Sequence, residues 1–256
     1  PALAPHAVYT CSESFLRQIA GIAQDTGIPM HIHLSETAKE VADCQNAHEG
    51  LTPIAYAERI GLLDGHSIVA HGVKATPEDI EILKNKDTYL VTNPMSNMKL
   101  GSGIAPIPDM LQAGVKVALG TDGAASNNTL NMFREMAAEA QIYKGIYEDS
   151  TIMPAQKVLK MATEDGAEAL GMGDYIGKIK EGYKADLIVL NLRNPEFMPL
   201  NGVISSLVYS SYGSEVETVI IGGEVVMEDR RFVMIDEEQI YSEVTWRAQK
   251  LKECIQ

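Results

Sequence analysis

Residues 31–36 read HIHLSE, in which two histidines are followed by a glutamate. On a β-strand, residues i and i+2 point to the same face, so His31 and His33 would share a direction. Imidazole and carboxylate groups together suit Zn²⁺ or Fe²⁺, so Glu36 could belong to the same site. Taken alone, however, the stretch favours an ordinary strand with two hydrogen-bonded polar residues.

Polar side chains also end other apolar stretches, with His71 in VAHG and Asp122 in GTDG. Each has an ordinary explanation when taken alone. His71 could be a buried, hydrogen-bonded histidine, Asp122 a turn or cap residue, and Glu36 the first-turn acid of a helix at residues 37–48. Their joint placement at successive strand ends, together with His33, is harder to explain in this way. It favours a metal site.

The chemistry expected of such a site is metal-assisted hydrolysis. A catalytic zinc ion needs about three protein ligands and one open position for water. The ion would lower the pKa of that water toward ~7 and so provide hydroxide at neutral pH. An adjacent carboxylate such as Glu36 can take the proton and deliver it to the leaving group.

The elements that must position these residues alternate regularly between helix and strand. Helical spacing and start signals predict helices at residues 12–27, 52–65, 76–86, 107–114 and 129–148. Apolar stretches predict strands at residues 28–34, 67–72, 88–94 and 115–123. Near-continuous apolar strands, each preceded by a helix, are typical of a parallel sheet covered by helices. Because every strand ends in polar residues, the pattern favours a barrel over an open sheet.

The pattern changes after about residue 173. Residues 177–192 and 216–232 read as β-strands with glycine-containing turns, and residues 237–255 read as a final helix. We therefore expect an α/β fold with a barrel portion at residues 1–172. A β-sandwich segment at 173–235 and a C-terminal helix at 236–256 would follow.

Composition narrows the class of protein. The formal net charge of −14 argues against nucleic acid and anionic membranes as general partners. The three cysteines are far apart and form no CxxC pair, which argues against a cysteine zinc site and favours a reducing compartment. We find no apolar run near the ~20 residues of a membrane span, no signal peptide pattern and no GxGxxG or P-loop motif. The expectation is a soluble, cytoplasmic protein.

Residues 93–136 begin NPMSNMKLGSGIAP and contain LGTDGAASNN. This string closely resembles the amidohydrolase superfamily, and within it the 5-methylthioadenosine/S-adenosylhomocysteine deaminase branch. The segments APHAVYTCS, HIHLSET and VAHGV are similar to motifs of that branch in the same order. GKIKEGYKADLIVLNL is similar to the C-terminal sandwich segment of the branch. The resemblance covers essentially the whole chain.

The resemblance implies one metal ion, usually zinc, in a (β/α)₈ barrel. By matched position, His33 is the ligand from strand five and Asp122 the ligand from strand eight, where it also accepts a proton from water. His71 ends strand six and polarises the water or the tetrahedral intermediate. Glu36 is the proton shuttle to the purine ring and contacts the substrate. His6 matches a substrate-contacting histidine after strand four.

Two further histidines bind the metal in this family, in an HxH motif on strand one. The HIH stretch here carries the glutamate spacing of strand five, so we expect His31 to pack beneath His33 without a ligand role. No HxH pair is formed by the remaining histidines, which are His6, His48, His66 and His71. Asn97 and Lys99 belong to a motif of the branch, and no role is assigned to them.

The resemblance therefore implies that the chain begins at the end of strand four and is the C-terminal portion of a longer protein. A half-barrel would leave parallel strand edges exposed, which favours aggregation or pairing. We expect this chain alone to be inactive, because two metal ligands are missing. A smaller departure is Thr92, where many relatives carry histidine, which affects substrate details near strand seven rather than the metal ligands.

The predicted function is hydrolytic removal of the 6-amino group from an adenine nucleoside, such as 5-methylthioadenosine or S-adenosylhomocysteine, with release of ammonia. One alternative keeps the site and changes the leaving group, as in guanine deaminases and triazine chlorohydrolases. Another is a non-catalytic fragment, which would not need all four strand-end residues of the site. The expected partner is a small-molecule nucleoside, and the expected cofactor is one Zn²⁺ per subunit, with Fe²⁺ as the other candidate. A homo-oligomer is left open.

Overall fold

The structure, a computed structural model, describes residues 1–255. The chain divides into two compact units. The first unit comprises Pro1–Tyr183 and Pro195–Gly213, and the second comprises Lys184–Asn194 and Ser214–Gln256. All of the strand-end residues singled out in the sequence lie in the first unit.

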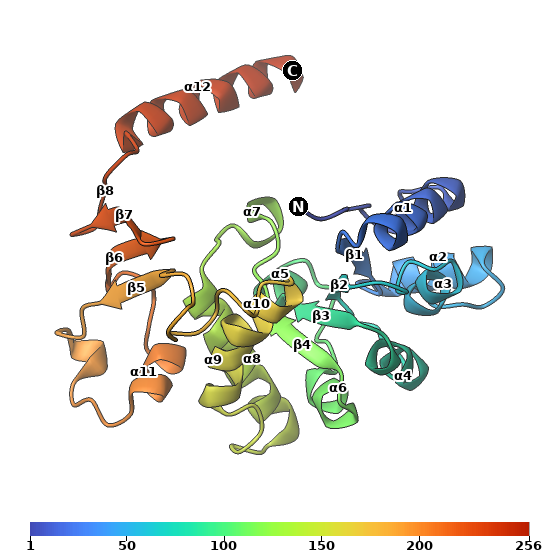
Figure 1. The fold of residues 1–256 in the computed structure, drawn as a ribbon, viewed down its shortest axis with the longest axis horizontal. Helices are drawn as coiled ribbons and strands as arrows, with labels where there is room; N and C mark the ends of the chain where they lie inside the picture. The colour runs from blue at the N-terminus through green and yellow to red at the C-terminus, as the bar shows by residue number, and fades with distance from the viewer. Residues whose placement is uncertain (256) are drawn as a thin grey trace. The chain divides into compact units, whose positions relative to one another are not determined.

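A parallel sheet lies at the centre of the first unit, with its strands in the order β1-β2-β3-β4 (Figure 1). The strands are β1 (Met30–Leu34), β2 (Ser67–His71), β3 (Thr88–Thr92) and β4 (Lys116–Leu119). The register places four buried residues in one row across the sheet: Ile32, Val69, Leu90 and Val117. The predicted α/β class with a parallel sheet is confirmed. The carboxyl ends of the four strands lie at one edge of the sheet.

Each strand of this sheet is preceded by a helix, as the sequence predicts. These helices are α1 (Glu13–Thr26), α3 (Pro53–Arg59), α4 (Pro77–Asn85) and α6 (Ile107–Ala113). Figure 1 shows α4 and α6 beside the sheet, where α4 packs against β3 and α6 against β4. The other helical elements of the unit are α2 (Ala38–Ala47), α5 (Pro94–Lys99), α7 (Ala124–Asn127), α8 (Met132–Tyr147), α9 (Ala155–Ala162), α10 (Glu164–Ala169), η1 (Pro195–Phe197) and α11 (Val203–Tyr209).

Local signals set the helix ends. Gly27 ends α1 in the left-handed conformation with φ of 68°, which glycine adopts without a steric penalty. Thr52 caps α3 through its side chain, and Thr76 does the same for α4 with Asp79 completing a capping box. Thr37 and Glu40 form the same motif at the start of α2. Gly27 thus fixes where the chain leaves α1 toward β1, and the threonine caps fix where the chain enters α2, α3 and α4.

Side-chain alternation in β1 decides where its histidines point. Met30, Ile32 and Leu34 are fully buried in the main hydrophobic core, whereas His31 and His33 are half-buried on the opposite face. Because successive side chains of a strand alternate between its faces, burying the apolar set directs both imidazoles away from that core. The shared direction of the two histidines is therefore confirmed.

The second unit is an antiparallel sheet followed by a helix. Its strands are β5 (Leu187–Leu190), β6 (Val216–Ile221), β7 (Glu224–Glu228) and β8 (Arg231–Phe232), hydrogen-bonded in that order. Helix α12 spans Glu237–Ile255, close to the predicted final helix. None of the helices in the described part of the chain is both long and apolar enough to cross a membrane.

Candidate metal and active site

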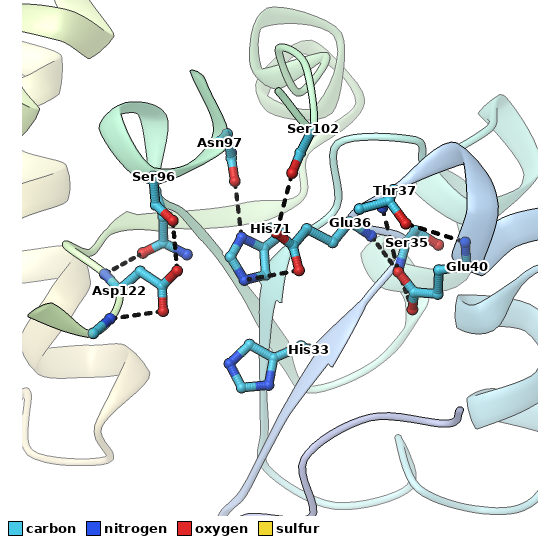
Figure 2. Close-up of polar contacts among 12 residues, drawn as sticks. His33, Ser35, Glu36, Thr37, Glu40, His71, Ser96, Asn97, Ser102 and Asp122 are labelled. Carbon is cyan, nitrogen blue, oxygen red and sulfur yellow. Dashed lines mark hydrogen bonds and ion pairs between the residues drawn. The ribbon is translucent and has the colours of Figure 1, made fainter. Parts of the chain in front are cut away.

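Three side chains from different strand ends meet at the carboxyl edge of the parallel sheet (Figure 2). His33 lies in β1, His71 ends β2, and Asp122 follows β4. One ligand atom from each lies within 4.8 Å of the others. His71 is only 1% exposed, and the other two are half-buried. The structure thus brings together residues that are 89 positions apart in sequence, from 33 to 122, in a cluster that suits a metal ion.

The His33 ring is oriented by a backbone acceptor. Its Nδ1 lies 2.7 Å from the carbonyl oxygen of His6, which can only accept a hydrogen bond, so Nδ1–H donates. Nε2 is then left with a free lone pair, the form in which imidazole binds a metal. A backbone partner of this kind is the usual support for a metal-binding histidine. The donor set, two imidazoles and one carboxylate, fits zinc.

Asp122 is held as an ionised carboxylate. Its Oδ2 accepts a hydrogen bond from Ser96 Oγ at 2.6 Å, and its Oδ1 accepts one from the Gly123 N–H at 2.7 Å. Burial by itself would raise the pKa of Asp122, but these hydrogen bonds and the nearby imidazoles of His71 and His33 hold that pKa below its usual value. The Asp122 carboxylate is therefore ready to bind a cation or accept a proton.

The Glu36 carboxylate lies beside the His71 ring, and Figure 2 shows Asn97 and Glu36 facing different nitrogens of that ring. Its Oε2 is 3.8 Å from His71 Nε2, and its Oε1 accepts a hydrogen bond from Ser102 Oγ at 3.1 Å. The alternative reading of Glu36 as a first-turn acid is wrong, because α2 begins at Ala38 with Thr37 as its N-cap. Glu36 precedes the helix, and its carboxylate faces the site.

The backbone that carries Glu36 is fixed by Glu40. The buried Glu40 carboxylate accepts hydrogen bonds from the N–H groups of Ser35, Glu36 and Thr37, at 3.1, 2.7 and 3.4 Å. Burial raises the pKa of Glu40, and the three N–H donors oppose that rise. The capping box of α2 therefore also holds the loop that presents Glu36.

Three residues at this edge adopt left-handed backbone conformations. The φ angles are 54° at Ser35, 75° at His71 and 59° at Asp122. Such conformations cost non-glycine residues roughly 1–3 kcal/mol each and concentrate at functional sites. At Asp122 the N–H donates to Asn93 Oδ1 at 3.1 Å, which helps to hold the conformation.

His6 and His31 lie beside the cluster. The exposed His6 ring has its centroid 5.0 Å from that of His33, and its Nδ1 is 3.0 Å from Thr10 Oγ1. The His31 ring lies 5.9 Å from that of His33, and burial lowers the pKa of His31, with His33 and His71 adding to this effect. His31 is outside the three-residue cluster. The expectation that His31 packs beneath His33 without a ligand role stays a prediction.

Sequence reasoning missed several residues that support the site. Ser96 and Ser102 each hydrogen-bond one site carboxylate, Asn97 contacts His71, and Glu40 binds the loop backbone. The signal available for the first three was the position of the NPMSNMKLGSG motif at residues 93–103, which directly follows the apolar part of a strand. Lys99 in the same motif donates to the carbonyl oxygen of Ala125 at 3.2 Å.

Comparisons with known proteins agree with this geometry. Residues 1–226 match the model of the Amidohydrolase family. A 5-methylthioadenosine/S-adenosylhomocysteine deaminase from Dictyoglomus turgidum is 46% identical over 246 residues, which are 96% of this chain and 57% of that relative. The chain thus spans little more than half the length of the curated relatives it matches.

Solved structures show the same similarity. An adenosine deaminase from Xanthomonas campestris with bound zinc matches with a TM-score of 0.93 and 36% identity, over 97% of this chain and 56% of that protein. A zinc-complexed atrazine chlorohydrolase from Arthrobacter aurescens matches with a TM-score of 0.89 and 26% identity, over 95% of this chain and 54% of that protein. The resemblance seen in the sequence is confirmed. The chain belongs to the amidohydrolase family.

Proposed function

We propose that the whole protein is a metal-dependent aminohydrolase that removes the 6-amino group from an adenine nucleoside of the 5-methylthioadenosine or S-adenosylhomocysteine type. The observation that carries the proposal is the cluster of His33, His71 and Asp122, with Glu36 Oε2 3.8 Å from the His71 ring. The relatives named as deaminases support the substrate class. The described residues would supply part of the active site.

We assign the metal to His33 and Asp122, with zinc as the expected ion, one per subunit, and Fe²⁺ as the other candidate. When bound, such an ion supplies Lewis acidity and a water acidic enough to act as a nucleophile near neutral pH. The zinc-bound adenosine deaminase of similar fold supports the choice of metal. The resemblance adds two histidines of an HxH motif on strand one, and this sequence has no HxH pair other than residues 31–33.

The chain's own residues would manage the protons. Asp122, kept ionised by its low pKa, accepts a proton from the attacking water. Glu36, oriented by Ser102, protonates the ring nitrogen beside the attacked carbon. His71 polarises the attacking group, and the exposed ring of His6 contacts the substrate. Asp122 then returns its proton to the amino group, the proton of the new hydroxyl passes to Glu36, and ammonia leaves from the tetrahedral carbon.

We also propose how the chain contributes to the fold of the whole protein. We infer that β1 to β4 are the last four strands of a (β/α)₈ barrel, with the barrel portion at residues 1–172. Residues 173–235 would complete part of a small β-sandwich, followed by the helix at 236–256. The similarity of the chain to the Xanthomonas adenosine deaminase supports this arrangement.

The test is an ammonia-release assay on the whole, zinc-loaded protein. 5-Methylthioadenosine, S-adenosylhomocysteine, adenosine and guanine would be offered side by side. Glu36→Gln keeps the shape of the side chain and removes its proton transfer, so we expect a loss of about 10²–10⁴-fold in kcat. No release from any adenine nucleoside by a folded, zinc-loaded protein would contradict the proposal.

A second candidate function changes the leaving group. The similarity to an atrazine chlorohydrolase favours a halogenated ring as the alternative substrate, with chloride as the product. Identity to that enzyme is 26%, against 46% to the named nucleoside deaminase, so deamination is preferred. Chloride release from atrazine without ammonia release from nucleosides would reverse the order. A folded protein that binds zinc and turns over neither class would support the non-catalytic alternative.

The 256-residue chain by itself should be inactive. Its six histidines include no HxH pair other than residues 31–33, which lie at the position of strand five. Two of the metal ligands implied by the resemblance are therefore absent from it. The measurement is zinc content and ammonia release of the purified chain. Turnover with one zinc ion per chain would show that His33, His71 and Asp122 suffice.

A further inference from the structure

One segment, residues 93–103, touches three different side chains of the site (Figure 2). The contacts are Ser96 Oγ to Asp122 Oδ2 at 2.6 Å, Asn97 Oδ1 to His71 Nδ1 at 2.8 Å, and Ser102 Oγ to Glu36 Oε1 at 3.1 Å. The side chains that receive these contacts come from the ends of β2, β1 and β4. A single turn of helix α5 with its following loop is thus the common support of the site.

This segment is itself firmly held. Ser96 and Asn97 are buried, with exposures of 0% and 2%. The Asn97 N–H donates to the carbonyl oxygen of Asn93 at 2.9 Å, and the Asn97 carbonyl oxygen accepts from the Ser102 N–H at 2.9 Å. A buried side chain on an internally hydrogen-bonded backbone has little freedom to change its partner. The contact of Asn97 with His71 is therefore a fixed feature of the fold.

The contact decides where the proton of a neutral His71 ring lies. Nδ1 has an oxygen at 2.8 Å, a normal hydrogen-bond distance, whereas Nε2 is 3.8 Å from Glu36 Oε2, which is too long for one. A neutral imidazole has one N–H and one lone pair, so the nitrogen that faces an acceptor keeps the proton. The lone pair is then on Nε2, which faces the cluster.

We propose that Asn97 is a positioning residue that keeps the ring proton of His71 on Nδ1. His71 then presents Nε2 to the site as an acceptor and not as a donor. An asparagine amide turned the other way would donate from Nδ2 to Nδ1 and move the ring proton to Nε2. The two arrangements give His71 opposite roles, so they can be told apart.

The position of the ring proton determines what His71 can do in a reaction. With the lone pair on Nε2, His71 can accept a hydrogen bond from an attacking water or bind a cation, the role proposed for Nε2 of His33. It cannot donate a hydrogen bond to a developing anion while it remains neutral. Polarisation by His71 therefore means orienting the nucleophile. This role rests on the proposed function, whereas the position of the proton does not.

The test is nitrogen NMR of the whole protein labelled with ¹⁵N at histidine, at about pH 8, where a free imidazole is neutral. Long-range proton–nitrogen correlations show which ring nitrogen carries the proton, and loss of a signal in His71→Gln assigns His71. We expect the proton on Nδ1 in the wild type and in Asn97→Asp, which keeps an acceptor oxygen. In Asn97→Leu, which has similar size and no acceptor, the Nδ1–H form should no longer dominate.

Ser102→Ala is the matched control, because it removes a contact of the same segment without touching His71. It should leave the His71 tautomer unchanged. For turnover, Asn97→Leu should lower kcat by about 10–100-fold and change KM by much less, since hydrogen-bond partners of metal-site histidines typically contribute at this level. Asn97→Asp should restore most of that loss.

A wild-type proton on Nε2, or an unchanged His71 tautomer in a folded Asn97→Leu protein, would overturn the inference. These readouts need neither metal nor substrate. If the protein released no ammonia from any nucleoside, the proposed function would fail while the proton position on His71 would still be measured. The two failures are therefore distinguishable.

Discussion

The buried serine hydroxyls around the site differ in whether they make a hydrogen bond. Ser96 Oγ donates to the Asp122 carboxylate at 2.6 Å, while Ser35 Oγ is buried with no hydrogen-bond partner among the described residues. Removing a hydroxyl that serves a charged group loses a hydrogen bond, whereas removing an unpartnered buried hydroxyl loses none. Both serines are fully buried, so the comparison is between like surroundings.

We therefore expect Ser96→Ala to lower the free energy of unfolding by about 1–2 kcal/mol, somewhat less than for a fully buried charge because Asp122 is only half-buried. Ser35→Ala should be neutral or slightly stabilising. Urea unfolding of the two variants at neutral pH gives the comparison. Equal losses in both would show that the hydroxyl contacts at this edge do not control stability.

The two histidines of β1 provide a second matched pair. His33 has its Nδ1 tied to the His6 carbonyl and belongs to the cluster, whereas His31 lies on the same face outside it. In the whole protein, His33→Ala should lose most of the bound zinc, and His31→Ala should keep about one ion per chain. Metal analysis after dialysis measures both. Loss of zinc in His31→Ala alone would mean that the ligand has been assigned to the wrong histidine.

At the scale of elements, two helices carry the same capping box with different consequences. The box of α2 uses Thr37 and Glu40, and the Glu40 carboxylate also binds the backbone of Ser35 and Glu36. The box of α4 uses Thr76 and Asp79. Both stabilise a helix start, but only the first also fixes a loop of the site.

Glu40→Ala should therefore lower both stability and turnover. It leaves three N–H groups without their acceptor, at a cost on the order of 1–3 kcal/mol, and frees the loop that presents Glu36. Thr76→Ala should cost about 1 kcal/mol and leave kcat unchanged. Thermal unfolding and the ammonia assay on each variant make the comparison. An equal effect of both on kcat would refute the special role of Glu40.

These elements also show how far a sequence can be interpreted. The ends of α1, α3 and α4 were predictable because Gly27, Thr52 and Thr76 act on their own helix turns. The parallel sheet followed from the apolar stretches and the helices between them. The strand-end residues of the site followed because the carboxyl ends of parallel strands share one edge.

What could not be predicted depends on contacts between distant residues. Ser102 contacts Glu36 across 66 positions, and Asn97 contacts His71 across 26. No local pattern encodes such pairs, which exist only once the sheet has formed. The left-handed conformation of Ser35 was likewise hidden, because serine gives no sign of a positive φ, and aspartate adopts one more often than most residues but too seldom to predict it at Asp122. Helix α5 was not predicted, because its 6 residues are too few to show a helical repeat.

At the scale of the whole molecule, helix α8 carries two buried carboxyl groups that affect the free energy of unfolding. Glu135 and Glu139 lie one turn apart on this helix, and both are fully buried. The Glu135 carboxyl accepts hydrogen bonds from the Met95 N–H and from Asn127 Nδ2, at 3.1 and 2.6 Å. Burial raises the pKa of Glu139 to about 8, the charge of Glu135 adds to this rise, and the Thr92 hydroxyl opposes it.

The stability of the protein should therefore depend on pH through Glu139. The ordinary pKa of a glutamate in an unfolded chain is 4.5, so between that value and about 8 the folded state holds a proton that the unfolded state releases. The Glu139 contribution is fully present below pH 4.5, declines as the pH rises, and is lost above about pH 8. Glu139→Gln, which stays neutral, should flatten this decline and make the protein more stable than the wild type at about pH 9, by a few kcal/mol. Urea unfolding at about pH 5, 7 and 9 tests this, with Glu135→Gln as the neighbouring control. If the free energy of unfolding of Glu139→Gln and of the wild type changed with pH in parallel, Glu139 would ionise in the folded protein as it does in water.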